Sequence, residues 1–214
     1  MNWIVTADGH EASLEFPVHA DYDIERIAHS LAQIVRFNGH ACRPYSVAEH
    51  SLLVLDIAQR HLKLDANAQM AALMHDAHEA FVGDVSTPMK ELLGTQMRRI
   101  ELRHSHLMSL QFGFHVALTM NHHELKLADL LALRVEREQL LPMTTPRGAP
   151  STPWPVLSWM QEWPMQYDLM DAGRVNTTWQ EWRDLFINAF QELQFARAAL
   201  SHERLGVGFA AETN

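Results

Sequence analysis

The residues best suited to chemistry lie in one short segment, 74–84. It contains two histidines and three carboxylates, namely His75, Asp76, His78, Glu79 and Asp84. They belong to a stretch rich in alanine, methionine and leucine, where a buried charge is costly unless it is paired or binds a metal. Neighbouring side chains on a helix point about 100° apart. His75 and Asp76 therefore reach a common cation only if it lies between their directions and other helices supply further ligands.

Two residues elsewhere in the chain are suitable donors for such a cation. His50 lies one turn into a predicted helix, and Asp129 lies among apolar neighbours on a later one. Two imidazoles and two carboxylates form a mixed set that suits Mn²⁺, Co²⁺, Fe²⁺, Ni²⁺ or Zn²⁺ better than Ca²⁺. Glu124, about one turn from Asp129, remains an alternative donor. We expect one divalent transition metal.

Apolar residues recur at helical spacing over most of the chain. Ser46 and Glu49 form a capping-box pattern. Asp65 and Asn121 are suitable helix caps, and Pro88 follows another helix start. Residues 2–16 contain an Asp-Gly pair and predict a short hairpin or an irregular arm. The sequence therefore predicts an all-α domain with helices over residues 23–37, 47–62, 66–81, 88–112, 122–141 and 178–201.

A change of composition marks residues 142–164. Six of the nine prolines lie there, which forbids a regular helix. Five of the six tryptophans lie in or after this segment, at Trp154, Trp159, Trp163, Trp179 and Trp182. We favour an ordered surface loop packed by its own aromatic side chains over a lid or a subunit contact.

The separated histidine, the adjacent His75-Asp76 pair and the distant aspartate resemble the HD-domain metal-dependent phosphohydrolases. More narrowly, residues 75–79 (HDAHE) followed by 83–90 (GDVSTPMK) are similar to the branch that contains bacterial 5′-deoxynucleotidases and phage-type dATP triphosphohydrolases. The resemblance includes residues 27–31, 36–40 and 45–51 and covers about 24–141. It implies one HD-type helical bundle over residues 1–214, in which 142–164 is an insertion.

The resemblance also implies a role for each site residue. The metal ligands would be His50, His75, Asp76 and Asp129. Glu79 would lie near the attacking water, and Asp84 would orient or activate it. Arg36 would contact the substrate phosphate, Phe37 would stand beside the sugar, and Lys90 would contact a phosphate.

Several of these residues have a plainer interpretation. Glu79 could orient a ligand histidine, Arg36 could be the cation at a helix C-terminus, and Lys90 could simply be solvated. His104 or His122 could serve a second metal, but no spacing requires it. The remaining histidines are expected to be surface or core residues.

Composition and charge exclude several classes of protein. The chain has 17 basic and 26 acidic residues and a net charge of −9, so non-specific binding to nucleic acid or an anionic membrane is not expected. Cys42 is the single cysteine, which excludes an internal disulfide. The sequence shows neither a signal peptide nor an apolar run long enough to cross a membrane. We therefore expect a cytoplasmic protein.

The combined expectation is a metal-dependent phosphoric ester hydrolase that converts deoxyribonucleoside 5′-monophosphates to nucleoside and phosphate. One alternative is a dNTP triphosphohydrolase that releases triphosphate. Another is a nucleotide sensor that binds without turnover, although the presence of both Glu79 and Asp84 favours catalysis. The tryptophan-rich region and the family resemblance predict a homodimer.

Overall fold

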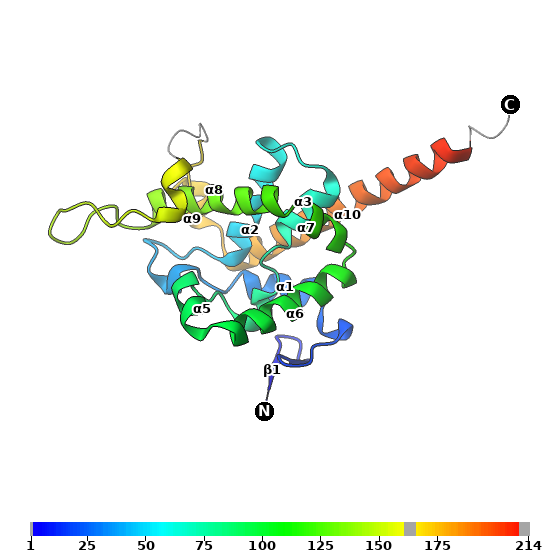
Figure 1. Cartoon of the computed structure of the whole chain (residues 1–214), viewed down its shortest axis with the longest axis horizontal. Coiled ribbons are helices and arrows are strands. Elements are labelled where there is room, and N and C mark those ends of the chain that lie inside the picture. Colours follow the sequence, from blue (N-terminus) through cyan, green and yellow to red (C-terminus); the bar gives the residue numbers. More distant parts are fainter. Residues whose placement is uncertain (1, 161–165, 210–214) are drawn as a thin grey trace.

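The computed structural model describes residues 2–160 and 166–209 and is predominantly helical, which confirms the all-α prediction (Figure 1). No helix in these two ranges is both long and apolar enough to cross a membrane. The α-helices are α1 (Ile24–Leu31), α2 (Val47–Arg60), α3 (Ala66–Leu73), α4 (Glu79–Val82), α5 (Thr87–Leu93), α6 (Thr95–Gln111), α7 (His115–Met120), α8 (His122–Leu140), α9 (Ala172–Asn176) and α10 (Trp179–Phe209). Short 3₁₀ helices are η1 (His19–Asp21), η2 (Phe37–Gly39) and η3 (Pro155–Met160).

The N-terminal arm is a β-hairpin. Strand β1 (Trp3–Val5) pairs antiparallel with β2 (Glu11–Ser13). A two-stranded hairpin is marginally stable in water by itself. Here it is fastened to the helical body, because Arg26 of α1 forms an ion pair of 2.6 Å with Asp8 in the turn.

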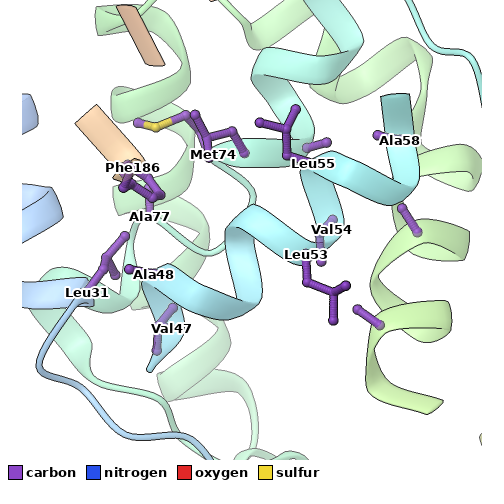
Figure 2. Packing of buried hydrophobic residues seen from close by; sticks show 14 of the residues in the cluster. Leu31, Val47, Ala48, Leu53, Val54, Leu55, Ala58, Met74, Ala77 and Phe186 are labelled. Carbon is purple, nitrogen blue, oxygen red and sulfur yellow. The ribbon is translucent and has the colours of Figure 1, made fainter. Parts of the chain in front are cut away.

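Helix α2 lies at the centre of the core. It packs against α1, α3, α8 and α10, and most of its residues are buried. Its start is fixed by Ser46, whose hydroxyl accepts the amide hydrogen of Glu49 at 3.1 Å. Apolar side chains of α2 meet those of α1 and α10 around it (Figure 2). This packing carries His50, in the second turn of α2, into the interior of the protein.

The capping box also predicted that the Glu49 side chain would bond the backbone N–H of Ser46, and this part of the prediction is wrong. The Glu49 carboxylate does not reach back to the start of α2. It accepts hydrogen bonds from Arg43 at 2.7 and 2.8 Å and from Arg174 of α9 at 3.0 Å. A fully buried carboxylate favours two charged donors over one backbone amide. The result is a buried ion cluster that joins α2 to the chain after the tryptophan-rich segment.

Replacing Glu49 by glutamine tests this cluster. Glutamine keeps the shape but leaves two arginines with no charged partner, and we expect the free energy of unfolding to fall by about 2 kcal/mol. Urea denaturation measures the change. Glu192→Gln, at an exposed position of α10, is the control and should change stability by less than about 0.5 kcal/mol. Equal losses in the two variants would contradict the assignment.

The predicted helix over 66–81 is interrupted, which corrects the sequence-based boundary. Helix α3 ends at Leu73, and α4 begins only at Glu79. Between them the backbone bonds tighten to a spacing of three residues, as in Ala77 N–H to Met74 O at 3.1 Å and Glu79 N–H to Asp76 O at 2.9 Å. His75 and Asp76 therefore lie in a turn and not on a regular helix.

Other helix boundaries also differ from the prediction. Helix α1 ends at Leu31, and the chain beyond it becomes extended, so Val35 bridges to Ser46. Gly94, with φ of +67°, divides the predicted helix 88–112 into α5 and α6. Asn121 does not cap α8, because its side chain donates to the Ala117 carbonyl at 3.0 Å. Sequence periodicity did not anticipate α7 or α9.

The final helix is longer than predicted. Helix α10 runs to Phe209, beyond the expected end near residue 201, and it projects from the body of the protein (Figure 1). Its residues Phe186, Phe190 and Leu193 are buried in the core, whereas Leu185 is 46% exposed.

The proline- and tryptophan-rich segment leaves the body of the protein after α8 and returns (Figure 1). Its outer part is a narrow loop closed by an isolated bridge between Thr144 and Pro150. The expected packing of its aromatics on one another is wrong for the part that is described. Trp154 contacts Phe37 outside the segment, and Trp159 is 62% exposed. Trp163 lies outside the described residues.

Candidate metal centre

Three of the four predicted metal ligands, His50, His75 and Asp76, lie close enough together to hold one ion, and Asp129 lies beside the two histidines. His50 Nε2 lies 3.3 Å from His75 Nε2, 3.5 Å from Asp76 Oδ2 and 3.5 Å from Asp129 Oδ1. His75 Nε2 lies 3.2 Å from Asp76 Oδ2 and 4.0 Å from Asp129 Oδ1. The side chains of Asp76 and Asp129 are each 21% exposed, so solvent reaches the cluster from their side. Three separate elements, α2, the turn before α4, and α8, supply these atoms.

The turn after α3 explains how neighbouring residues reach the same point. On a regular helix, His75 and Asp76 would diverge by about 100°. The tightened turn redirects both side chains, and His75 Nδ1 is anchored 2.8 Å from the Ala72 carbonyl. A ring nitrogen beside a carbonyl carries the hydrogen, so the lone pair of the neutral ring lies on Nε2 and faces the cluster.

Glu136 of α8 is a buried residue of the site that the sequence analysis missed. Its carboxylate lies 2.5 Å from His50 Nδ1, accepts the Tyr45 hydroxyl at 3.0 Å and pairs with Arg36 at 3.2 Å. A signal was present, because Glu136 follows Asp129 by two helical turns on a face that is otherwise apolar. The carboxylate orients His50 as it would orient a ligand imidazole.

The carboxylates of the cluster favour the protonated form of His50, and the histidines favour the ionised forms of Asp76 and Asp129. Burial alone would raise the pKa of Asp76, but His75 and His50 hold it well below the usual range. Burial likewise opposes ionisation of Asp129, yet hydrogen bonding to His50 and the charge of His75 lower its pKa. The pKa of His50 is raised well above its usual value although burial and Arg36 oppose this, because Glu136, Asp129 and Asp76 surround the ring.

Arg36 lies beside the cluster and not at a helix C-terminus. It comes five residues after the end of α1, in extended backbone. Its guanidinium pairs with Glu136 and approaches Asp76 Oδ2 at 3.6 Å. Burial lowers the pKa of Arg36, but Glu136, Asp76 and Asp84 outweigh it and raise the pKa. Its Nε atom has no hydrogen-bond partner among the residues that the structure describes.

Glu79 and Asp84 approach the cluster with raised pKa values. Burial is the largest cause for both groups, and the charge of Asp76 adds to it. Arg36 and Lys90 act in the opposite direction. Glu79 is 2% exposed, and within the described part of the chain its Oε2 has no hydrogen-bond partner. The raised pKa values make these two carboxyl groups the candidates for proton exchange at the site.

Lys90 is paired and not simply solvated. Its ammonium group lies 2.7 Å from Glu101 of α6 and 3.8 Å from Glu79. Glu101 also lies 3.7 Å from His78 Nε2. The ion pairs place Lys90 close to the candidate catalytic carboxyl group.

Glutamine at position 79 tests the raised pKa of Glu79 in the metal-free protein. A buried acid whose folded-state pKa exceeds its unfolded value loses folding stability as the pH rises from the unfolded value to the folded one. Glu79→Gln removes that loss, so we expect its melting temperature to exceed that of the wild type by about 2–4 °C at pH 8. The advantage should vanish near pH 4, where both forms are neutral. Thermal denaturation in a chelator over this pH range measures it, and a constant difference would contradict the shift.

The donor set and the surrounding charge fit a divalent transition metal. Two imidazole nitrogens and two carboxylates form the mixed set that such ions prefer. Lys126 already forms an ion pair with Asp129 at 2.7 Å. Although burial opposes it, the pKa of His50 is raised because carboxylates surround the ring, so this point favours a positive charge, which a bound cation would also supply.

The structure does not bring the alternative donors to this point. Glu124 is exposed, which leaves Asp129 as the carboxylate that α8 directs to the cluster. His104 is buried elsewhere, bonded to the Tyr22 hydroxyl at 3.0 Å and near the Leu14 carbonyl. His122 is exposed at the start of α8.

Comparison with known proteins identifies relatives of this chain. No family model matches the chain. The chain is 36% identical over 142 residues to an uncharacterized protein of Rhodobacter capsulatus, covering 64% of this chain and 72% of that protein. It is 32% identical over 140 residues to the uncharacterized protein YfdR of Escherichia coli (strain K12), covering 65% and 73% of the two chains. Neither name states an activity.

Proposed function

The chain belongs to the family of the uncharacterized protein YfdR of Escherichia coli and its relative from Rhodobacter capsulatus, and we propose that it is a metal-dependent nucleotide phosphohydrolase. The observation that carries the proposal is the grouping of His50, His75 and Asp76, with Asp129 of α8 beside the two histidines. The proposed substrates are deoxyribonucleoside 5′-monophosphates, as the sequence resemblance implies.

The proposed metal would be held by these four residues. A divalent ion at such a site supplies Lewis acidity toward a phosphoryl oxygen and lowers the pKa of a water molecule. Glu136 and the Ala72 carbonyl fix the ring orientations of His50 and His75, so both Nε2 atoms are aimed before any ion enters. The identity of the ion is a proposal limited to Mn²⁺, Co²⁺, Fe²⁺, Ni²⁺ and Zn²⁺.

The protein's own residues would bind the phosphate and move the protons. Arg36 is held rigidly by Glu136 and retains N–H groups for a phosphate oxygen. In the proposed hydrolysis, a water oxygen bonds to phosphorus and the ester P–O bond breaks. The water loses a proton to an ionised carboxylate, and the departing 5′-oxygen gains a proton from a protonated carboxyl group. Glu79 and Asp84 are the groups whose raised pKa values suit these transfers.

Product identification tests the proposal. Metal-stripped protein would receive Mn²⁺ or Co²⁺ and a panel of dNMPs, NMPs and dNTPs, with products separated by anion-exchange chromatography. Nucleoside and orthophosphate from dNMPs would support the proposal. Nucleoside and intact triphosphate from a dNTP would contradict the proposed monophosphate substrate and support the alternative, a dNTP triphosphohydrolase. Metal binding without turnover of any nucleotide would favour the sensor.

The homodimer and the cytoplasmic location stay predictions. Exposed apolar side chains on α10, such as Phe195 at 78%, are compatible with a second copy of the chain. Light scattering at micromolar concentration would show the dimer, and a monomer mass would reject it.

A further inference from the structure

Two neighbouring aromatic rings, Phe37 and Trp154, lie between two arginines beside the candidate metal centre. The Arg36 guanidinium lies 5.5 Å from the centre of the Phe37 ring. The Phe37 ring lies 6.5 Å from the Trp154 ring, at an interplanar angle of 44°. The Arg137 guanidinium lies 5.3 Å from the centre of the Trp154 ring. Each ring is therefore oriented by a cation on one side before any ligand arrives.

Arg137 fastens the tryptophan-rich segment to the same helix turn that supports the metal centre. It is almost fully buried, donates to the Pro142 carbonyl at 3.0 Å and contacts the Ser151 hydroxyl. Its neighbour Glu136 pairs with Arg36. Arg36 therefore contacts α8 in two ways. It pairs directly with Glu136, and it is connected to Arg137 through the rings of Phe37 and Trp154. A segment that only connected α8 to α9 over the surface would not need contacts with residues beside the candidate metal centre.

The backbone at Phe37 is in an unusual conformation. Phe37 has φ of +57°, Asn38 has +51° and Gly39 has +76°, which places three successive residues in the left-handed region. A phenylalanine there is strained, and such strain persists where the surrounding structure holds it, often at ligand sites. The conformation directs the Phe37 ring between Arg36 and Trp154.

We propose that Trp154 is the stacking surface for the nucleobase of the substrate, and thus a specificity-determining residue. The inference rests on the proposed function, because Arg36 would hold the phosphate and Phe37 would stand at the sugar. Phosphate, sugar and base follow one another in a nucleotide in the order in which Arg36, Phe37 and Trp154 follow one another here. The half-buried indole keeps part of its surface accessible to a ligand.

Deoxyadenosine is the probe that separates base binding from hydrolysis, because it carries no phosphate. Stacking on an aromatic side chain contributes enough to change affinity by about tenfold. We expect Trp154→Leu to weaken deoxyadenosine binding about tenfold in calorimetry. Trp154→Phe, which keeps an aromatic ring, should stay within about threefold of the wild type. Trp159→Leu, in the same segment at an exposed position, should bind as the wild type does.

Base-free substrate and fluorescence supply further readouts. KM for dAMP should rise about tenfold in Trp154→Leu, a larger change than that in the KM for base-free 2-deoxyribose 5-phosphate. Deoxyadenosine should quench the fluorescence of the wild type more than that of Trp154→Phe at equal occupancy. This comparison remains informative even if Trp154→Leu fails to fold.

The outcomes distinguish this inference from the proposed function. Unchanged deoxyadenosine affinity in folded Trp154→Leu, or equal quenching in wild type and Trp154→Phe, would overturn the role of Trp154. Hydrolysis of dNMPs would then still support the proposed function. Binding that depends on Trp154 without any hydrolysis would retain the inference and reject the enzyme.

Discussion

His75→Ala and Asp76→Ala should each lose both the bound metal and the activity. Each substitution removes one of the proposed metal donors, and the remaining donors are too few to hold the ion tightly. A metal provides several kcal/mol of stabilisation to a phosphoryl-transfer transition state, so we expect kcat/KM for the substrate to fall by at least about a thousandfold. Metal content measured on the purified proteins should fall from about one ion per chain to a trace.

A control variant and a stability measurement make this prediction specific. His122→Ala removes an exposed histidine of α8 and should keep metal, activity and melting temperature. In the metal-free state His75→Ala should remain folded, because the ring contacts one carbonyl and the polar groups of the cluster and is not part of the apolar core. Full activity in either metal-free variant would reject the mechanism. Retained metal with lost activity would move His75 or Asp76 from the ligand set to a catalytic role.

Sequence reasoning reached the candidate site because its signal is chemical and not geometric. Two histidines and three carboxylates in an apolar stretch are costly to bury, whatever the local backbone does. The expectation that His75 and Asp76 belong together therefore survived an error about the helix that carries them. The turn at residues 74–78 was not predictable from periodicity, because Met74 and Ala77 fit a continuous helix equally well.

Side-chain partners were less predictable than elements. Glu49 fitted a capping box, but Arg174, distant in sequence, competes for its carboxylate once the chain folds. Glu136 follows Asp129 by two helical turns, but that spacing alone does not tell a buried carboxylate from an exposed one. The packing of Trp154 on Phe37 is a long-range contact with no local signal. Helix start residues such as Ser46 were predicted because their partner is the adjacent backbone.

Replacing Glu136 should affect stability and metal binding separately. Glu136→Ala removes the partner of the buried guanidinium of Arg36 and of the Tyr45 hydroxyl, and breaking a buried ion pair in this way costs about 3–5 kcal/mol of folding free energy. Glu136→Gln retains the volume and one oxygen, so we expect a smaller loss. Urea denaturation of both variants measures this part of the effect.

Glu136→Gln should also weaken metal binding about 10–100-fold, because an amide does not fix the ring and tautomer of His50 as a carboxylate does. Metal titration of the folded variant measures it. Glu138→Gln, two residues later on α8, is the matched control, since its exposed pair with Arg134 contributes less than about 1 kcal/mol and lies on another face. Wild-type metal affinity in a destabilised Glu136→Gln would make Glu136 a residue of the core alone. Reduced affinity at preserved stability would instead establish that Glu136 positions His50 for the metal.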